Sequence, residues 1–251
     1  MVLLLSVDLD PDLAALRPLA GFFVLRTERA SAGSLPTLAQ TYAATSPDVS
    51  GNPLIFRVQK VATALRVPES RVAASVTHQG LAARLWSIAL GCAALYGSVP
   101  DLGARLLRWD PDGSAPDDLW LPEVTPLPGD AATLADVVLH GHLVPLSAAL
   151  RAHHRLAPGL LRGNAASALA GAGRELEHRA RRHGRTDAAA RARSLTTELL
   201  AHPLLTGAGT LSGAAFRRRS CCLYYRVPGG GVCGDCCFTR APRSSPHASS
   251  G

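Results

Sequence analysis

The feature that most constrains this chain is a group of cysteines near its C-terminal end. Five of the six cysteines lie within the segment RRRSCCLYYRVPGGGVCGDCCF, residues 217–238. Their spacing is C-C-x10-C-x2-C, with one further cysteine directly after it. Crowded thiolates repel one another, and a free thiol has a pKa of about 8.5, so each is disfavoured at neutral pH. A bound metal removes both problems, and the spacing therefore predicts a metal centre.

This metal centre is either a zinc ion or an iron–sulfur cluster. The pair Cys233 and Cys236 has the C-x2-C spacing that both kinds of site use. The adjacent pair Cys221 and Cys222 favours the cluster, because neighbouring side chains diverge and two irons offer more positions than one small tetrahedral ion. Zinc stays open as the alternative, and a reducing compartment argues against a disulfide set.

The residues around the cysteines suit a tight, positively charged metal loop. Three consecutive glycines, 229–231, follow Pro228 and allow the chain to reverse sharply. Tyr224 and Tyr225 are expected to shield the centre from water or to pack the small segment. Nearby guanidinium groups favour the more negative, reduced form of a thiolate-bound cluster. These groups belong to Arg217, Arg218, Arg219 and Arg226.

Composition places the rest of the chain among globular proteins. The 251 residues are 47% apolar and 18% charged, which is enough to build a core. The net charge of +7 leaves a surface attractive to acidic partners. The N-terminal end lacks the pattern of a secretory signal, and the longest apolar stretch, 80–95, is interrupted by Arg84 and too short to span a bilayer. We expect a cytoplasmic protein without an integral membrane segment.

The predicted fold class is α+β and helix-rich, because small aliphatic residues dominate and aromatic residues make up only 5%. A β-like run covers 22–27, and a hairpin joins 106–109 to 119–121 around an Asp-Pro-Asp-Gly turn. Loops are expected at 46–53 and 125–130. Helices are predicted at 11–19, 35–45, 54–65, 68–95, 130–139, 143–154 and 164–205, the last bent near Gly184.

The change of composition after Thr206 predicts three parts of the chain. Residues 1–205 form a helix-rich domain, residues 206–240 the metal-binding segment, and residues 241–251 a disordered tail. The sixth cysteine, Cys92, lies on an apolar helix face and is expected to be a buried small hydrophobe. Seven arginines between 174 and 193 share a polar helix face, which is either solvated or a docking face for an acidic electron donor or an anionic ligand.

The cysteine spacing resembles that of the siderophore-iron reductase family, the FhuF-like ferric iron reductases. The resemblance rests on the runs RRSCCLYYR and CGDC, with looser similarity in ARLWS at 83–87 and LRGNAAS at 161–167. It implies a [2Fe–2S] cluster bound by Cys221, Cys222, Cys233 and Cys236. The departure from the family pattern is Cys237, which follows the fourth ligand directly.

The resemblance also implies a function, the one-electron reduction of Fe³⁺ in a siderophore complex, notably a hydroxamate. The partners are then a ferric siderophore and an external electron donor such as a ferredoxin or a reductase, with no nucleic acid. The catalytic residues are unknown, and Arg84, Trp86 and Trp109 are candidates for the chelate pocket. Two alternatives remain: an iron–sulfur sensor or regulator whose arginines bind nucleic acid, and a zinc-stabilised binding module.

Overall fold

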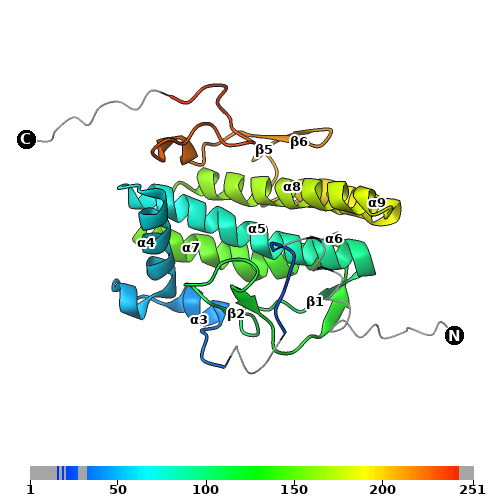
Figure 1. Ribbon diagram of the computed structural model, residues 1–251, viewed down its shortest axis with the longest axis horizontal. Coiled ribbons are helices and arrows are strands. Elements are labelled where there is room, and N and C mark those ends of the chain that lie inside the picture. The colour runs from blue at the N-terminus through cyan, green and yellow to red at the C-terminus, as the bar shows by residue number, and fades with distance from the viewer. Residues whose placement is uncertain (1–15, 17–18, 20, 28–32, 243–251) are drawn as a thin grey trace, which may run out of the picture.

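The structure is a computed structural model that describes residues 16, 19, 21–27 and 33–242. Figure 1 shows a bundle of long helices, with the C-terminal segment along one side and short strands along the other. The α+β, helix-rich class predicted from the sequence is confirmed. The predicted helix at 11–19 and the predicted tail at 241–251 lie almost entirely outside the described residues.

Helix α5, Ser70–Tyr96, is the central element of the bundle. The helix predicted over 68–95 is confirmed, and it ends where Gly97 adopts a left-handed φ of +73°. Its predicted apolar face is buried, and Cys92 on that face belongs to the core. Burial raises the pKa of the Cys92 thiol to about 12. This cysteine is therefore a packing residue, as expected.

Helices α8 (Pro158–Arg182) and α9 (Thr186–Leu200) form a hairpin that packs against α5. The sequence predicted one helical region over 164–205 with a bend near Gly184. The helix is interrupted there, and Gly184, with a φ of +72°, turns the chain from α8 into α9. A Cβ at Gly173 would lie only 2.2 Å from the Thr196 hydroxyl oxygen, so the missing side chain sets the close spacing of the two helices.

Helices α3 (Leu38–Ala43) and α4 (Pro53–Leu65) cover one end of the bundle (Figure 1). Both confirm helices predicted at 35–45 and 54–65. The Asn52 side chain accepts hydrogen bonds from the N–H groups of Leu54 and Ile55 at the start of α4. Pro53, at the first helical position, has no N–H group that needs an acceptor. The loop predicted at 46–53 contains a short 3₁₀ turn, η2, at Val49–Gly51.

One continuous helical stretch replaces the two helices predicted at 130–139 and 143–154. It consists of α6 (Ala131–Leu134), the π-helical η3 (Ala135–Leu143) and α7 (Val144–His153). Pro145 would clash with the carbonyl four residues earlier in a regular α-helix, and the wider π-helical turns precede that position. Among the described residues, only this stretch is long and apolar enough to cross a membrane, with a mean hydropathy of 1.3. Core helices pass the same test, and 44% of the apolar window is buried in the protein.

The strands are short and pair as three antiparallel ribbons among the described residues. The predicted hairpin is confirmed, with Trp109 opposite Leu119. The prediction of a loop at 125–130 was wrong, because residues 126–128 form a strand. A two-stranded ribbon tolerates residues such as Pro126, which cannot donate a backbone hydrogen bond. Of the β-like run predicted at 22–27, only Arg26 forms a β-bridge, to Trp120. The pairs are β1 (Ser98–Pro100) with β4 (Pro126–Pro128), β2 (Arg108–Trp109) with β3 (Leu119–Trp120), and β5 (Gly209–Ser212) with β6 (Ala215–Arg218).

Candidate metal centre and the adjoining cavity

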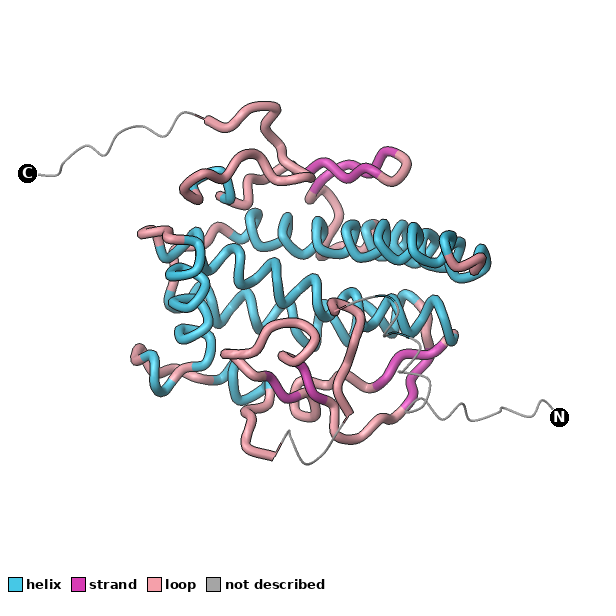
Figure 2. The backbone as a smooth tube through the Cα atoms, viewed as in Figure 1, coloured by secondary structure: helices cyan, strands magenta, loops and turns pink. Residues whose placement is uncertain are grey.

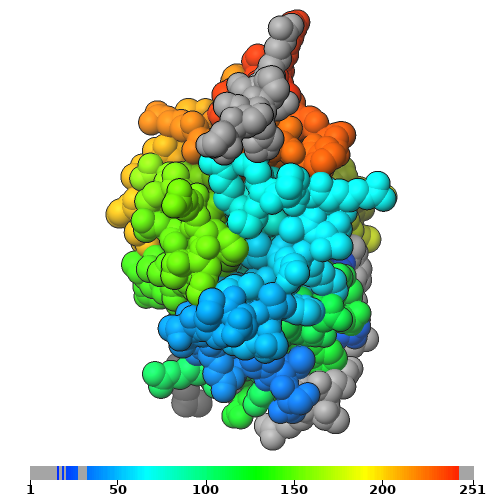
Figure 3. Space-filling model, turned by 90° about the vertical axis from the view of Figure 1, so that its left-hand side faces the viewer, coloured from blue at the N-terminus to red at the C-terminus, as the bar shows by residue number. Residues whose placement is uncertain are grey.

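The cysteine segment follows the β5–β6 ribbon and consists mainly of loop (Figure 2). Its one helical turn is η4, Tyr224–Arg226, preceded by Leu223 with a left-handed φ of +69°. Contacts of β6 with α8 and of η4 with α5 hold the segment on the bundle. In Figure 3 the segment, in orange, lies on top of the helices. Loop backbone with little regular structure is suited to turning several thiols toward one point.

Two of the predicted ligands are already in contact. The sulfur atoms of Cys222 and Cys233 lie 3.4 Å apart, near the separation of about 3.8 Å that two thiolates have on one tetrahedral metal. Backbone N–H groups point at two further sulfurs, from Leu223 to Cys221 at 3.2 Å and from Phe238 to Cys236 at 3.4 Å. The segment thus forms one sulfur pair and stabilises negative charge on two other sulfurs.

No three Cys, His, Asp or Glu side chains of the described residues form a group that would hold a single metal ion. A two-iron cluster bound by four cysteines takes two thiolates at each iron. The observed pair, Cys222 with Cys233, has the spacing that one such position requires.

The thiol pKa values show how strongly the sulfurs interact. The contact between Cys222 and Cys233 lowers the pKa of Cys222 and raises that of Cys233, since one proton is shared by two sulfurs. Burial raises the pKa of Cys221 to about 11 and also raises that of Cys237. Four ionised thiolates would not persist here without a bound cation, which is what a metal centre provides.

A buried cation beside the sulfurs supplies a second test of fit. The side chain of Arg218 is 2% exposed, yet no carboxylate among the described residues pairs with it. Its guanidinium donates only to neutral oxygens: Ser220 O (3.1 Å), Gln79 Oε1 (3.2 Å), Leu160 O (3.3 Å) and Asn164 Oδ1 (2.5 Å). A buried charge needs a counter-charge, and its electrostatic influence reaches the thiols of Cys222 and Cys233. An anionic thiolate-bound cluster would be that counter-charge.

Polar side chains of α5 and α8 fix the segment in place. Asn164 donates to the carbonyl of Ser75 at 2.9 Å, and the Ser75 hydroxyl donates to the carbonyl of Cys222 at 2.8 Å. A Cβ at Gly163 would lie 2.2 Å from the Ser220 hydroxyl oxygen, so glycine permits the close approach. The LRGNAAS run, in which only a loose resemblance was seen, therefore contains the residues that receive the metal segment.

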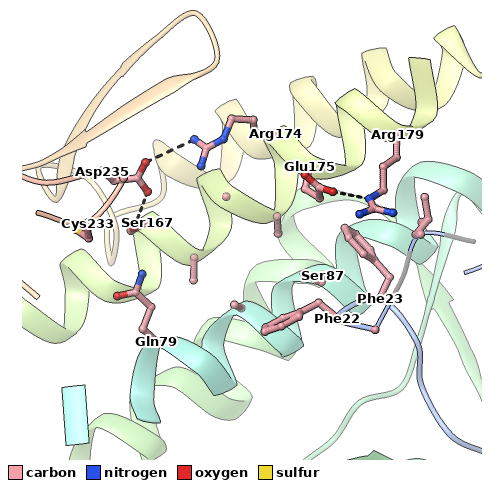
Figure 4. Close-up of a pocket in the computed structure, with 17 residues that line it drawn as sticks. Phe22, Phe23, Gln79, Ser87, Ser167, Arg174, Glu175, Arg179, Cys233 and Asp235 are labelled. Atoms are coloured by element: carbon pink, nitrogen blue, oxygen red, sulfur yellow. Dashed lines mark hydrogen bonds and ion pairs between the residues drawn. The ribbon is translucent and has the colours of Figure 1, made fainter. Parts of the chain in front are cut away.

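Asp235, which lies between the predicted ligands Cys233 and Cys236, is held by α8. Its carboxylate accepts a hydrogen bond from Ser167 at 2.6 Å and faces Arg174 at 3.6 Å (Figure 4). Its backbone carbonyl accepts the N–H of Arg218 at 3.0 Å. Sequence reasoning missed the roles of Gln79 and Ser167, because nothing in their local sequence marks them as partners of a segment so far along the chain, and it missed Asp235 because its partners lie on α8.

A cavity of about 470 Å³ opens between α5, α8, the Phe22 region and the cysteine loop. Figure 4 shows two ion pairs along its α8 side, Arg174 with Asp235 and Arg179 with Glu175. The remaining lining is mostly apolar or small. It consists of Leu19, Gly21, Phe22, Phe23, Gln79, Ala83, Ser87, Ser167, Ala168, Gly171, Ala172, Cys233 and Gly234. A predicted metal ligand thus lines a cavity large enough for a small molecule.

The residues suggested from sequence for a chelate pocket do not line this cavity. Trp86 is fully buried in the core. Arg84 is buried as well, pairing with Asp118 at 2.8 Å and donating to the backbone of the Phe22 region. Together with Trp109, Arg84 borders a different cavity of about 320 Å³. Trp86 is thus a core residue, whereas Arg84 and Trp109 stay candidates for a pocket at that second cavity.

The arginine face of α8 and α9 is largely neutralised by acids of the same helices. Glu177, for example, pairs with both Arg181 and Arg193, and Asp187 pairs with Arg185. This favours the solvated helix face over a docking face for an anion. Tyr225 packs edge-on against Phe238, with ring centres 6.0 Å apart, whereas Tyr224 is 38% exposed.

Comparison with known proteins identifies the cysteine segment. Residues 218–238 match the family model described as the FhuF 2Fe-2S C-terminal domain. The match begins at the buried Arg218 and includes all five clustered cysteines. No curated protein matches the chain. The resemblance noted from the sequence is thereby confirmed for this segment, and the cofactor that it indicates is a [2Fe–2S] cluster.

Proposed function

We propose that this chain, whose residues 218–238 form a FhuF-type 2Fe-2S domain, is a ferric-siderophore reductase acting in the cytoplasm. The observation that carries the proposal is the sulfur pair of Cys222 and Cys233 beside the buried Arg218, which has no carboxylate partner among the described residues. Hydroxamate oxygens hold Fe³⁺ tightly and Fe²⁺ weakly, so one added electron releases the iron without cutting the organic ligand. The substrate class is therefore a ferric siderophore, of hydroxamate type.

The residues that would hold the cluster are Cys221, Cys222, Cys233 and Cys236. When bound, the [2Fe–2S] cluster supplies single electrons to the ferric substrate. The fifth cysteine, Cys237, is left as a spare thiol, because consecutive side chains diverge and Cys236 completes the family spacing.

The chain's own groups prepare this region for negative charge. Arg218 provides a positive charge that burial keeps from being screened by water or salt. The N–H groups of Leu223 and Phe238 point at sulfur atoms and stabilise their negative charge further. All of these contributions favour the reduced state of the domain and so raise its reduction potential.

The exposed side of the same segment suits an acidic electron donor, such as a ferredoxin or a reductase. Tyr224, Val232 and Phe238 expose 38%, 41% and 38% of their surface, each within two residues of a cysteine. Arg217 is exposed next to Phe238 and donates to the Cys237 carbonyl, whereas the exposed Arg219 lies near Gly207, and neither pairs with an acid of the described residues. A small apolar patch edged by free cations is complementary to an acidic protein surface.

The reductase proposal is tested with protein purified without oxygen. A red-brown protein with iron and sulfide, and an S = 1/2 EPR signal after reduction, is expected. Stopped-flow mixing of the reduced protein with a ferric hydroxamate should reoxidise it, and a ferrous chelator should then capture the iron. Reoxidation no faster than in buffer with every ferric chelate would remove the reductase assignment. A colourless protein with stoichiometric zinc would support the binding-module alternative instead.

The donor surface has its own test. The double change Arg217→Gln and Arg219→Gln should slow reduction by an acidic ferredoxin and flatten the dependence of the rate on ionic strength. The control is Arg182→Gln, which removes one exposed cation from the end of α8. Equal rates for all variants would place the donor elsewhere.

A further inference from the structure

We infer that the cavity between α5, α8 and the cysteine loop is the chelate-binding site, and that its charge-balanced lining selects ferric chelates of low net charge. The inference rests on the proposed reductase function for the identity of the ligand. Its structural basis is separate, since it uses the shape and charges of a cavity that lies outside the matched segment except at residues 233–235.

The position of the cavity is the first argument. Its volume of about 470 Å³ lies within the range of about 300–1,000 Å³ that is usual for small-molecule sites. One end is formed by Cys233, Gly234 and Asp235 (Figure 4). A ligand in the cavity therefore rests directly against a residue that would bind the cluster. Short separations of this kind are what electron transfer between two metal centres requires.

The charges of the lining are the second argument. Two arginines, Arg174 and Arg179, are matched by two carboxylates, Asp235 and Glu175, so the described residues of the lining carry no net charge. Three hydroxamates neutralise Fe³⁺, whereas three catecholates leave a trianion. A trianion here would find no surplus of positive charge and would approach the negative sulfurs of the adjoining centre. An uncharged chelate meets neither obstacle.

The apolar part of the lining is the third argument. Phe22 is 47% exposed and lines the cavity, although most large apolar side chains of this protein are buried. Phe23, Ala83 and Ala168 extend the same surface. An exposed aromatic at a cavity mouth indicates a contact with something other than water. The carbon chains that link the iron-binding groups of a hydroxamate chelate fit such a surface.

The decisive experiment measures binding without any electron transfer. Gallium(III) hydroxamate has the charge and shape of the ferric complex but is not reduced under these conditions, so calorimetric titration into the holoprotein reports binding alone. Gly171→Phe fills the cavity from α8, where a Cβ meets only the tip of Arg174 at 4.0 Å. Gly80→Phe, at an exposed glycine of α5 outside the cavity, is the matched control.

We expect Gly171→Phe to weaken gallium-chelate binding by about tenfold or more, with unchanged iron content and visible spectrum, and Gly80→Phe to bind like the original protein. Equal binding by Gly171→Phe would overturn the site. Rapid reduction of the ferric chelate without saturable binding of the gallium chelate would also overturn it, while leaving the reductase function in place. Saturable binding that Gly171→Phe abolishes, with no reduction of the ferric chelate, would instead refute only the proposed function.

Charge selection is tested at the pair farther from the cysteines. Glu175→Gln leaves Arg179 unpaired and gives the lining a net positive charge. The ratio of gallium tris-catecholate to gallium hydroxamate binding should rise severalfold at low ionic strength and less at high ionic strength. An original protein that binds the trianion as well as the uncharged chelate, or a ratio unchanged by Glu175→Gln, would contradict selection by charge.

Discussion

The helical bundle and the cysteine segment are stabilised in different ways. Helix α5 buries apolar side chains along most of its length, and α8 and α9 pack against it or against each other through small residues. The segment from 219 to 238 buries only Cys222 and Val227 and is positioned by polar contacts such as Ser75 with Cys222. The bundle therefore has a core of its own, whereas the segment depends on the bundle for its position. This predicts that damage to the metal site and damage to the bundle can be separated.

The largest effect is expected from removing a ligand. Cys222→Ser or Cys233→Ser should abolish or destabilise the cluster, because a serine oxygen is a poorer iron ligand here than a thiolate. Far-UV circular dichroism should remain close to that of the original protein, since the helices have an independent core. Iron and sulfide analysis of protein purified without oxygen is the measurement.

Cys237→Ser is the matched control for that experiment. It should retain full iron and the native spectrum, because the spacing leaves Cys237 as a spare thiol. Loss of the cluster in Cys237→Ser, with retention in Cys236→Ser, would exchange the roles of these two neighbours.

The next effect concerns the buried cation that links the two regions. Arg218→Gln should lower the reduction potential, since it removes an unscreened positive charge beside the sulfurs. It should also destabilise the attachment of the segment, because Asn164 and three other acceptors lose their donor. Arg218→Lys restores the charge but not the forked hydrogen bonds, so it should recover the potential more than the stability.

Arg217→Gln serves as the control. Because Arg217 is exposed and its charge is screened by solvent, the reduction potential of this variant should shift much less than that of Arg218→Gln. Redox titration measures all three variants. Equal shifts for Arg217→Gln and Arg218→Gln would mean that burial does not distinguish the two arginines.

A smaller effect is expected where the segment touches α8. Gly163→Ala places a Cβ against the Ser220 hydroxyl and the Arg218 guanidinium, so the segment must move. Overpacking of this kind costs about 1–3 kcal/mol. Chelator-induced loss of iron should accelerate, while the thermal unfolding of the helices shifts little. Gly159→Ala, where nothing lies within 4 Å of the added Cβ, is the control, and equal rates of iron loss would contradict the prediction.

The effect that is smallest near neutral pH belongs to the bundle alone. His142 is buried, with its ring between the Tyr42 hydroxyl at 3.0 Å and the Leu102 carbonyl at 2.6 Å. Burial lowers its pKa to about 4, below the ordinary value of 6.5. Between these values the unfolded chain binds a proton that the folded chain does not. The contribution of His142 to folding stability should therefore fall by about 1.4 kcal/mol per pH unit as the pH drops from 6.5 toward 4, in addition to that of the buried His78, whose pKa is lowered to about 3.

Urea unfolding of Cys222→Ser at several pH values isolates this effect from the metal. The added change His142→Gln should reduce the slope of stability against pH over that range. A slope that does not depend on His142 would show that other groups control the acid response of the bundle.

The sequence predicted most of what local pattern controls. The long apolar run of α5 and the turn between β2 and β3 were found because each is encoded by neighbouring residues. Strand β4 was missed because its prolines resemble a loop. Within the run of three arginines, only alternation along β6 distinguishes Arg218, which points inward with Phe216 while Arg217 faces out. That strand was not predicted, so the one structural arginine looked like its neighbours.

The metal site and the cavity also differ in whether neighbouring residues of the sequence encode them. The ligand spacing is contained in sixteen consecutive residues and could be recognised directly. The cavity combines Phe22, Gln79, Ser167 and Cys233, which are brought together only by the packing of α5 against α8. No local pattern carries that information, and the tryptophans proposed for the pocket were chosen by residue type alone.

The contribution of the cysteine loop to the cavity wall couples two parts of the protein that look separate along the chain. Since Cys233, Gly234 and Asp235 form one end of the cavity, the position of the loop also sets the shape of the cavity. The contact of Asp235 with Ser167 joins the loop to α8, so a displacement of the loop would remodel the wall against which a ligand rests.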